Sequence, residues 1–164
     1  MIKLNDALKN KLKEAHRVGV LGIGSEFRGD DAAGIMVAER LIKYYSRNKK
    51  IQEKIKVFIG STAPENVTGE IKRFRPEHLI IIDSANMGKP VGAMEIIEPG
   101  DVEGFSFCTH SLPLKTMAIY LISEIGCKIT IIGIQPKTIH FGSKVSDKVV
   151  SSVKKLANSI QASL

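Results

Sequence analysis

Acidic side chains and a histidine follow the apolar segments of this 164-residue chain. Asp30 and Asp31 come shortly after the apolar run 18–23, Asp83 ends a second run, and His110 lies in a polar stretch further along. Two carboxylates in one crevice repel each other, so either one of them takes up a proton or a cation lies between them. A neutral imidazole as a third ligand favours a borderline divalent metal, such as nickel or zinc, over calcium. Three protein ligands would leave coordination positions open to a substrate.

Each of these residues also has a purely structural interpretation. Asp30 and Asp31 could cap a helix and complement its dipole. Asp83 could form an Asx-turn after its strand, and His110 could lie in a surface loop. Only the joint pattern of the four side chains favours a functional site.

The elements that must position these residues alternate between apolar runs and amphipathic segments. Strands are expected at 18–23, 55–59, 78–83 and 128–134, and an antiparallel edge strand at 93–97. One helix is expected to begin after Asp30, its N-cap, and to end at about residue 45. Further helices are expected at 65–74, 111–125 and 146–162. Apolar strands between helices are typical of a mostly parallel sheet covered on both faces. We therefore predict an α/β fold, a three-layer α/β/α sandwich with a mostly parallel five-stranded sheet and one antiparallel edge strand.

The predicted sheet brings the candidate residues together. In sheets of this kind, ligands bind in the crevice outside the carboxyl ends of the strands. Asp31, Asp83 and His110 each follow a strand or open a helix, so we expect them to converge at that edge.

Length and composition predict one domain over residues 1–164. With 43% hydrophobic and 25% charged residues, the chain can bury its own core. Residues 1–16 form a leading amphipathic helix, with Leu4, Leu8 and Leu12 at helical spacing, and residues 17–164 form the rest of the domain. The sequence carries no signal for an oligomeric state.

Several protein classes are excluded by the same numbers. The longest apolar runs are much shorter than the ~20 residues that cross a bilayer, so no membrane insertion is expected. The N-terminal segment lacks the apolar stretch of a signal peptide, which predicts a cytoplasmic protein. The net charge is +7, but the basic residues are dispersed and aromatic residues make up 5%, so we expect no nucleic-acid partner. Cys108 and Cys127 are too few for a disulfide framework, and Cys127 has the apolar neighbours of a core residue.

Two other chemistries have weak support in the sequence. The turn at Gly22 and Gly24 has the start of a dinucleotide-binding motif, but Phe27 stands where the third glycine belongs. The acidic pair that follows would also face the pyrophosphate, which is unfavourable. Cys108 and His110 could form a thiolate pair, but nothing in the sequence indicates a lowered thiol pKa.

Five segments together resemble the hydrogenase maturation endopeptidases. The segment 22–34, GIGSEFRGDDAAG, resembles the family's glycine turn with its acidic pair, although Ser25 replaces the usual asparagine. HLIIIDSA resembles the family's apolar strand ending in an aspartate, and THSLP its histidine block. GST at 60–62 and the closing segment 135–146 also match, in the family's order. The resemblance covers residues 17–164, the part of the domain similar to a hydrogenase maturation protease.

This resemblance implies a function and a set of site residues. Such proteins are endopeptidases that remove a C-terminal extension from the nickel-loaded precursor of a [NiFe]-hydrogenase large subunit. Asp31, Asp83 and His110 stand at the positions of the family's metal ligands and are the expected catalytic and metal-binding residues. The weaker candidates for a substrate loop are Gly24, Asp30, Gly60 and Thr62. The nickel would be supplied by the substrate rather than held tightly by the isolated protein, and the partner would be the precursor.

Two alternatives remain open at this point. Asp31 and Asp83 could share a proton in a metal-independent hydrolase of the aspartic type. The chain could instead be a chaperone that recognises the nickel-loaded large subunit without cutting it. Asp83 could act either as a ligand or as a base.

Overall fold

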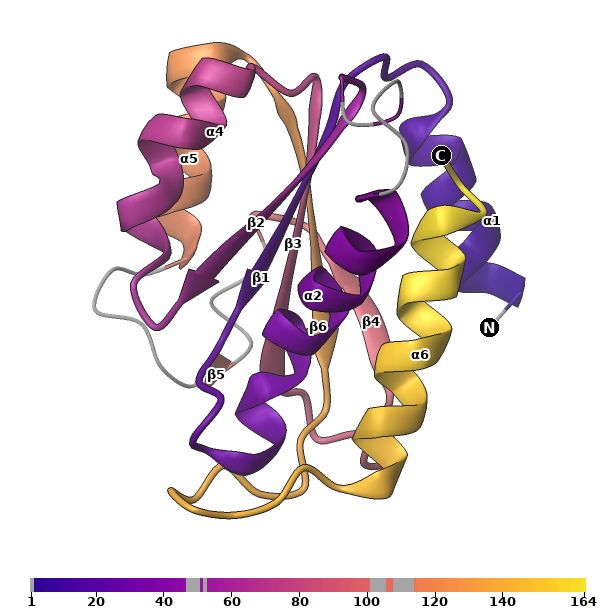
Figure 1. The fold of residues 1–164 in the computed structure, drawn as a ribbon, viewed down its shortest axis with the longest axis vertical. Coiled ribbons are helices and arrows are strands. Elements are labelled where there is room, and N and C mark those ends of the chain that lie inside the picture. Colours follow the sequence, from indigo (N-terminus) through magenta and orange to yellow (C-terminus); the bar gives the residue numbers. More distant parts are fainter. Residues whose placement is uncertain (1, 47–50, 52, 101–105, 108–113) are drawn as a thin grey trace.

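The computed structural model describes residues 2–46, 51, 53–100, 106–107 and 114–164 (Figure 1). They form an α/β fold in which one sheet lies between two layers of helices, as predicted. No helix in these ranges is both long and apolar enough to cross a membrane.

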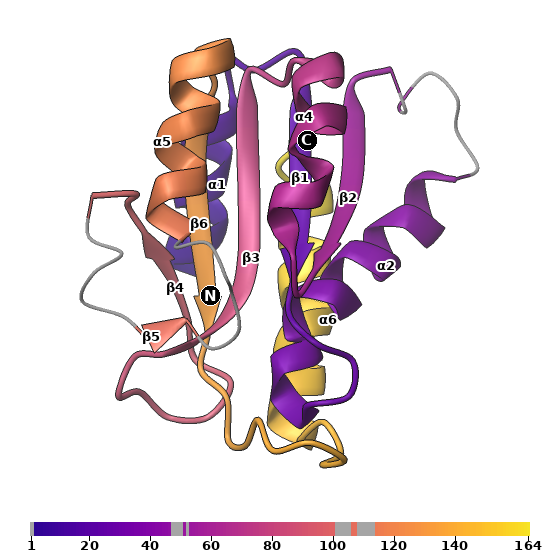
Figure 2. The same cartoon turned by 90° about the vertical axis from the view of Figure 1, so that its left-hand side faces the viewer.

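The central sheet has five strands in the order β2-β1-β3-β6-β4, which can be followed from edge to edge in Figure 2. The first four strands are parallel, and β4 pairs antiparallel with β6, which confirms the predicted edge strand. A short strand, β5, pairs antiparallel with the end of β3. The strands are β1 (Val18–Ile23), β2 (Ile55–Ser61), β3 (His78–Asn86), β4 (Met94–Ile97), β5 (Ser106–Phe107) and β6 (Lys128–Ile134).

Helices cover both faces of this sheet. The first layer consists of α1, α2 and α6, and the second of α4 and α5 (Figure 1). The helices are α1 (Ile2–Leu12), α2 (Ala33–Tyr45), α4 (Thr68–Phe74), α5 (Leu114–Ile125) and α6 (Asp147–Gln161). Two 3-10 turns, η1 (Gly29–Ala32) and η2 (Pro64–Val67), directly precede α2 and α4. The leading helix is present but ends at Leu12 and not at residue 16, and the core position of Cys127 agrees with the sequence prediction.

The strands are apolar on both sides because each side packs against helices. Along β3, Ile80 and Ile82 lie in the core under α2 and α6, whereas Ile81 lies in the core under α4 and α5. Successive side chains of a strand point to opposite faces. The same alternation places Asp83 on the α4/α5 side of the sheet and Ser84 on the α2/α6 side.

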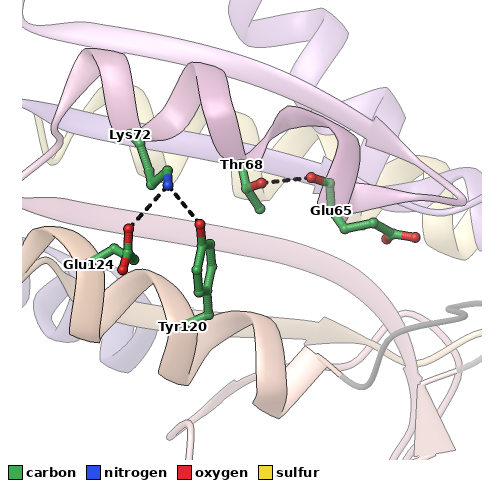
Figure 3. Close-up of polar contacts among 5 residues, drawn as sticks. All are labelled: Glu65, Thr68, Lys72, Tyr120 and Glu124. Carbon is green, nitrogen blue, oxygen red and sulfur yellow. Dashed lines mark hydrogen bonds and ion pairs between the residues drawn. The ribbon is translucent and has the colours of Figure 1, made fainter.

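A polar contact joins α4 to α5 on the outside of the second layer (Figure 3). Lys72 Nζ donates to the hydroxyl of Tyr120 at 2.7 Å and to Glu124 Oε2 at 3.1 Å. These two hydrogen bonds raise the pKa of Lys72. At the start of α4, the Thr68 hydroxyl donates to the carbonyl oxygen of Glu65 at 2.7 Å. The helices that follow β2 and precede β6 are therefore tied together.

The expected N-cap role of Asp30 is wrong. A 3-10 turn over Gly29–Ala32 comes before the helix, and Ala32 occupies the N-cap without a side-chain hydrogen bond. The carboxylate of Asp30 accepts hydrogen bonds from a distant loop instead, and these donors compete successfully with the local N–H groups.

The third strand is longer than the sequence predicts. β3 does not end at Asp83 but continues to Asn86. Its pairing with β1 stops at Ile82, while β6 continues to Ser84 and β5 pairs with Ala85 and Asn86. Pairing with two later segments of the chain thus extends the strand beyond its apolar run.

Candidate active site

The chain reverses its direction of travel across the sheet between β1 and β3. From β1 it crosses through α2 to β2 at one edge, and from β2 it returns through α4 to β3 on the other side of β1. Open α/β sheets bind ligands outside the carboxyl ends of the strands at such a point. Asp31 follows β1 here, and Asp83 is the first residue of β3 beyond its pairing with β1.

Glycines allow the start of α2 to lie directly against the ends of these two strands. Gly24 has a φ of +134°, and a Cβ on it would lie 1.8 Å from the carbonyl oxygen of Asp31. A Cβ on Gly34 would lie 2.3 Å from the carbonyl oxygens of Ile23 and Ile82. Only residues without a side chain permit this approach, so the glycine motif determines where Asp31 lies.

Ser84 contacts both candidate carboxylates. Its backbone N–H donates to Asp83 Oδ1 at 2.7 Å, and its hydroxyl donates to Asp31 Oδ1 at 2.7 Å. All three residues have an exposed fraction of 0%. The two predicted acidic residues therefore share one neighbour at the carboxyl edge of the sheet.

One oxygen of Asp31 is left over. Oδ2 is buried and has no hydrogen-bond partner within the part of the chain that the structure describes. A buried carboxylate oxygen without a donor costs free energy. Either a proton or a cation at Oδ2 would remove that cost, which matches the two possibilities that the sequence left open.

The adjacent Asp30 is fully paired and belongs to a different set of contacts. Its Oδ2 accepts from the N–H groups of Lys137 at 2.7 Å and Thr138 at 3.3 Å, and from the Ser146 hydroxyl at 3.0 Å. Its Oδ1 accepts from the N–H of Ser146 at 2.6 Å. Asp30 thus holds the loop between β6 and α6, whereas Asp31 lies beside Ser84 and Asp83.

The other residues named from the sequence are His110, Cys108, Thr62 and Gly60. His110 lies outside the described residues, as does Cys108. Thr62 is exposed just after β2. The end of β2 is joined to the glycine turn by a hydrogen bond from Gly24 N–H to the Ser61 carbonyl at 3.0 Å. Gly60 packs against Pro64, where a Cβ would be 3.0 Å away.

The described residues alone do not complete a metal site. No group of three or more His, Cys, Asp or Glu side chains that could hold a metal ion occurs within the described ranges. A site made of Asp31, Asp83 and a third ligand therefore needs a residue from elsewhere in the chain or a group brought by a partner.

Sequence reasoning missed two residues of this region. Ser84 follows the aspartate in sequence, and strand alternation alone predicts that it points to the opposite face from Asp83. Gln135 is also buried, and its Oε1 accepts from the N–H groups of Met87 at 2.7 Å and Lys89 at 3.2 Å. Gln135 opens the closing segment 135–146, but sequence reasoning assigned it no role, because the N–H groups that donate to its Oε1 lie more than forty residues away.

Known proteins are similar to this chain over most of its length. A family model described as hydrogenase maturation protease matches residues 35–163. The Hydrogenase 3 maturation protease of Escherichia coli K12 is 32% identical over 136 residues, which are 82% of this chain and 83% of that protein. The chain belongs to the hydrogenase maturation protease family. A Methanocaldococcus jannaschii protein, provisionally named as such a protease, is 37% identical over 96% of this chain and 94% of its own length.

Solved structures of the family have the same fold as this protease. The [NiFe] hydrogenase maturation protease HycI from Thermococcus kodakarensis KOD1 superposes with a TM-score of 0.85 at 30% identity, over 96% of this chain and 98% of that one. A Hydrogenase 3 maturation protease superposes with a TM-score of 0.73 at 30% identity, over 87% of each chain. Family membership makes the protein a protease of the endopeptidase type.

The two adjacent aspartates of this protease should differ in how strongly the same substitution changes the free energy of unfolding. Asp30→Asn turns an amide N–H₂ toward backbone N–H donors, and it should lower the free energy of unfolding by about 2–4 kcal/mol. Asp31→Asn removes a buried charge that lacks a donor on one oxygen, and it should change that free energy by less than about 1 kcal/mol.

Urea denaturation of both variants beside the unsubstituted protein measures these values. Equal destabilisation by the two substitutions would contradict the separate roles assigned to Asp30 and Asp31.

Proposed function

We propose that this protease removes the C-terminal extension from the nickel-loaded precursor of a [NiFe]-hydrogenase large subunit and recognises the precursor through its nickel. The observation that carries the proposal is the buried Oδ2 of Asp31, which lacks a donor among the described residues while Ser84 fixes Oδ1. Relatives named as maturation proteases of [NiFe] hydrogenase and of Hydrogenase 3 support the substrate class.

The chemistry of the donor set suits nickel carried by the substrate. Carboxylate oxygens and an imidazole nitrogen are ligands that borderline divalent metals accept. Asp31 offers a pre-oriented oxygen, Asp83 lies on the other side of Ser84, and His110 is the third proposed ligand. With two or three protein ligands, the ion keeps its attachment to the precursor, which is a reason for the isolated protease to hold no nickel tightly.

Contact with the nickel would place the scissile peptide bond at the carboxyl edge of the sheet. Holding two reacting groups in a fixed geometry supplies a large part of a rate enhancement. Hydrolysis then adds water across the bond: the carbonyl carbon gains the hydroxyl, and the leaving nitrogen gains the proton. Asp83, which shares Ser84 as a neighbour with Asp31, would either hold the nickel or accept the proton from the attacking water.

The alternative that the unpaired Asp31 Oδ2 also supports is a metal-independent mechanism of the aspartic type. A proton on Asp31 Oδ2 would satisfy that oxygen as well as a cation would. The two mechanisms differ in the precursor they accept, because only the nickel-dependent protease requires nickel in its substrate.

Intact-mass measurement tests the proposal with nickel-loaded and nickel-free precursor. We expect the mass of the C-terminal extension to be lost only from the nickel-loaded form. Asp83→Asn and His110→Ala should each lower the cleavage rate about 100-fold or more, since each removes a group that contacts the reacting centre.

Asp6→Asn on the exposed side of α1 is the matched control and should cleave at the normal rate. Cleavage of nickel-free precursor at the same rate would favour the aspartic-type mechanism. An unchanged mass of the nickel-loaded form would contradict the peptidase activity.

Ser84 should act as a positioning residue for Asp31. Ser84→Ala removes the only described donor to the Asp31 carboxylate, and loss of such a supporting hydrogen bond typically lowers metal affinity or activity by about 10–100-fold. The measurement is kcat/KM for cleavage of the nickel-loaded precursor.

Ser159→Ala provides the matched control, because that serine is also buried and its hydroxyl donates to the Lys155 carbonyl at 2.8 Å. If Ser84→Ala cleaves as fast as Ser159→Ala, Ser84 does not position Asp31.

A further inference from the structure

Two stacked phenylalanines are exposed beside the candidate active site. Phe27 is 67% exposed and Phe141 is 81% exposed, more than any other large hydrophobic side chain in the described part of the protein. Their rings stack with centroids 6.2 Å apart and an interplanar angle of 30°. We refer to Phe27 and Phe141 as the aromatic platform.

The aromatic platform is held by its backbone, although its two halves come from distant parts of the sequence. Gly142 N–H donates to the carbonyl of Phe27 at 2.8 Å, and Asp30 N–H donates to the carbonyl of Thr138 at 2.9 Å. Arg28 Nε donates to the carbonyl of Ile139 at 3.1 Å. Together with the Asp30 carboxylate, these contacts fix both loops, so the rings are presented to solvent by an ordered frame.

The platform lies on the same edge of the sheet as the candidate site. Phe27 belongs to the loop between β1 and η1, four positions before Asp31, and Phe141 belongs to the loop between β6 and α6. Figure 1 shows both loops at the carboxyl edge, near the N-terminal ends of α2 and α6. A partner that reaches Asp31 therefore passes close to the two rings.

The charges around the platform are mostly positive. Lys137 and Lys144 are exposed on the loop of Phe141, and Arg28 follows Phe27. The two loop segments 25–29 and 136–146 contain one acidic residue, Glu26. An exposed apolar patch with a polar rim is typical of a protein interaction site, and this rim favours an acidic partner surface.

We propose that the aromatic platform is the docking site of the large-subunit precursor, where it receives an apolar side chain of the precursor that is flanked by acidic residues. This inference rests on the proposed function, since it assigns a binding surface to the same substrate. A protease that acts on one folded partner must contact it beyond the scissile bond, and the platform is continuous with the loop that carries Asp31. Pre-ordered aromatic side chains are typical anchors of such contacts because little entropy is lost when they bind.

The size of the platform argues against a second copy of this chain as the occupant. Two phenylalanine side chains offer at most about 300–500 Å² of contact surface. A stable dimer buries about 600 Å² or more on each partner. The platform is large enough for one anchoring side chain and its neighbours.

The test measures binding and cleavage separately, with nickel-loaded precursor. The double variant Phe27→Ala/Phe141→Ala should raise the Kd in a titration, and the KM for cleavage, about tenfold or more. Its kcat should stay within about twofold, because the rings do not contact the reacting atoms. Lys144→Glu should raise KM at low salt and lose this effect at high salt.

Tyr44→Ala is the matched control, because Tyr44 is an aromatic residue 57% exposed near the C-terminal end of α2. It should leave both Kd and KM unchanged. Since all three aromatic side chains are exposed, the variants are expected to fold, and thermal unfolding checks this.

Each unfavourable outcome has one meaning. An unchanged Kd and KM in the double variant would overturn the docking proposal while leaving the proposed function intact. Binding of precursor by the unsubstituted protein without cleavage would overturn the proposed function and leave the platform supported, provided the double variant still weakens binding. A concentration-dependent dimer that the double variant abolishes would identify a second copy as the occupant and overturn the proposal.

Discussion

A carboxylate buried with one oxygen unsatisfied is the constraint on which the site depends. Asp31 is fully buried and receives one hydrogen bond, from the Ser84 hydroxyl, among the described residues. Such a group lowers the stability of a fold unless a proton or a cation compensates for it. Its position at the point where the sheet reverses its strand order is where open α/β sheets bind ligands.

The surrounding structure supplies what is needed to keep Asp31 in place. Gly24 in the loop after β1 and Gly34 in α2 let the start of α2 contact the ends of β1 and β3, so the backbone of Asp31 is fixed by close packing. The preceding residue, Asp30, accepts four hydrogen bonds that hold the loop after β6 against the same turn. The two adjacent aspartates therefore have different roles: Asp30 stabilises the loops after β1 and β6, and Asp31 faces the candidate site. The same loops also present Phe27 and Phe141 to solvent.

The strands and layers of this fold follow from local patterns. Apolar runs such as 79–82 predict buried strands because both of their faces pack against helices, and the antiparallel edge strand was recognisable from its position after a loop. The pairing of β3 beyond Asp83 was not predictable, because it depends on residues of β5 and β6 that are distant in sequence.

The candidate carboxylates could be named from sequence, but their different partners could not. Asp30 was expected to cap a helix, and only tertiary contacts with Ser146 and Lys137 decide otherwise. Ser84 is 53 residues from Asp31, so no local spacing reveals their hydrogen bond.

We propose that Asp31, Asp83 and His110 meet around a nickel ion. Diffraction at the nickel absorption edge, from crystals of the protease soaked in a nickel salt, tests it most directly. We expect one anomalous peak within about 2.2 Å of Asp31 Oδ2, of a carboxylate oxygen of Asp83 and of a ring nitrogen of His110. An anomalous peak elsewhere on the protein, with none in contact with Asp31, Asp83 and His110, would contradict this proposal.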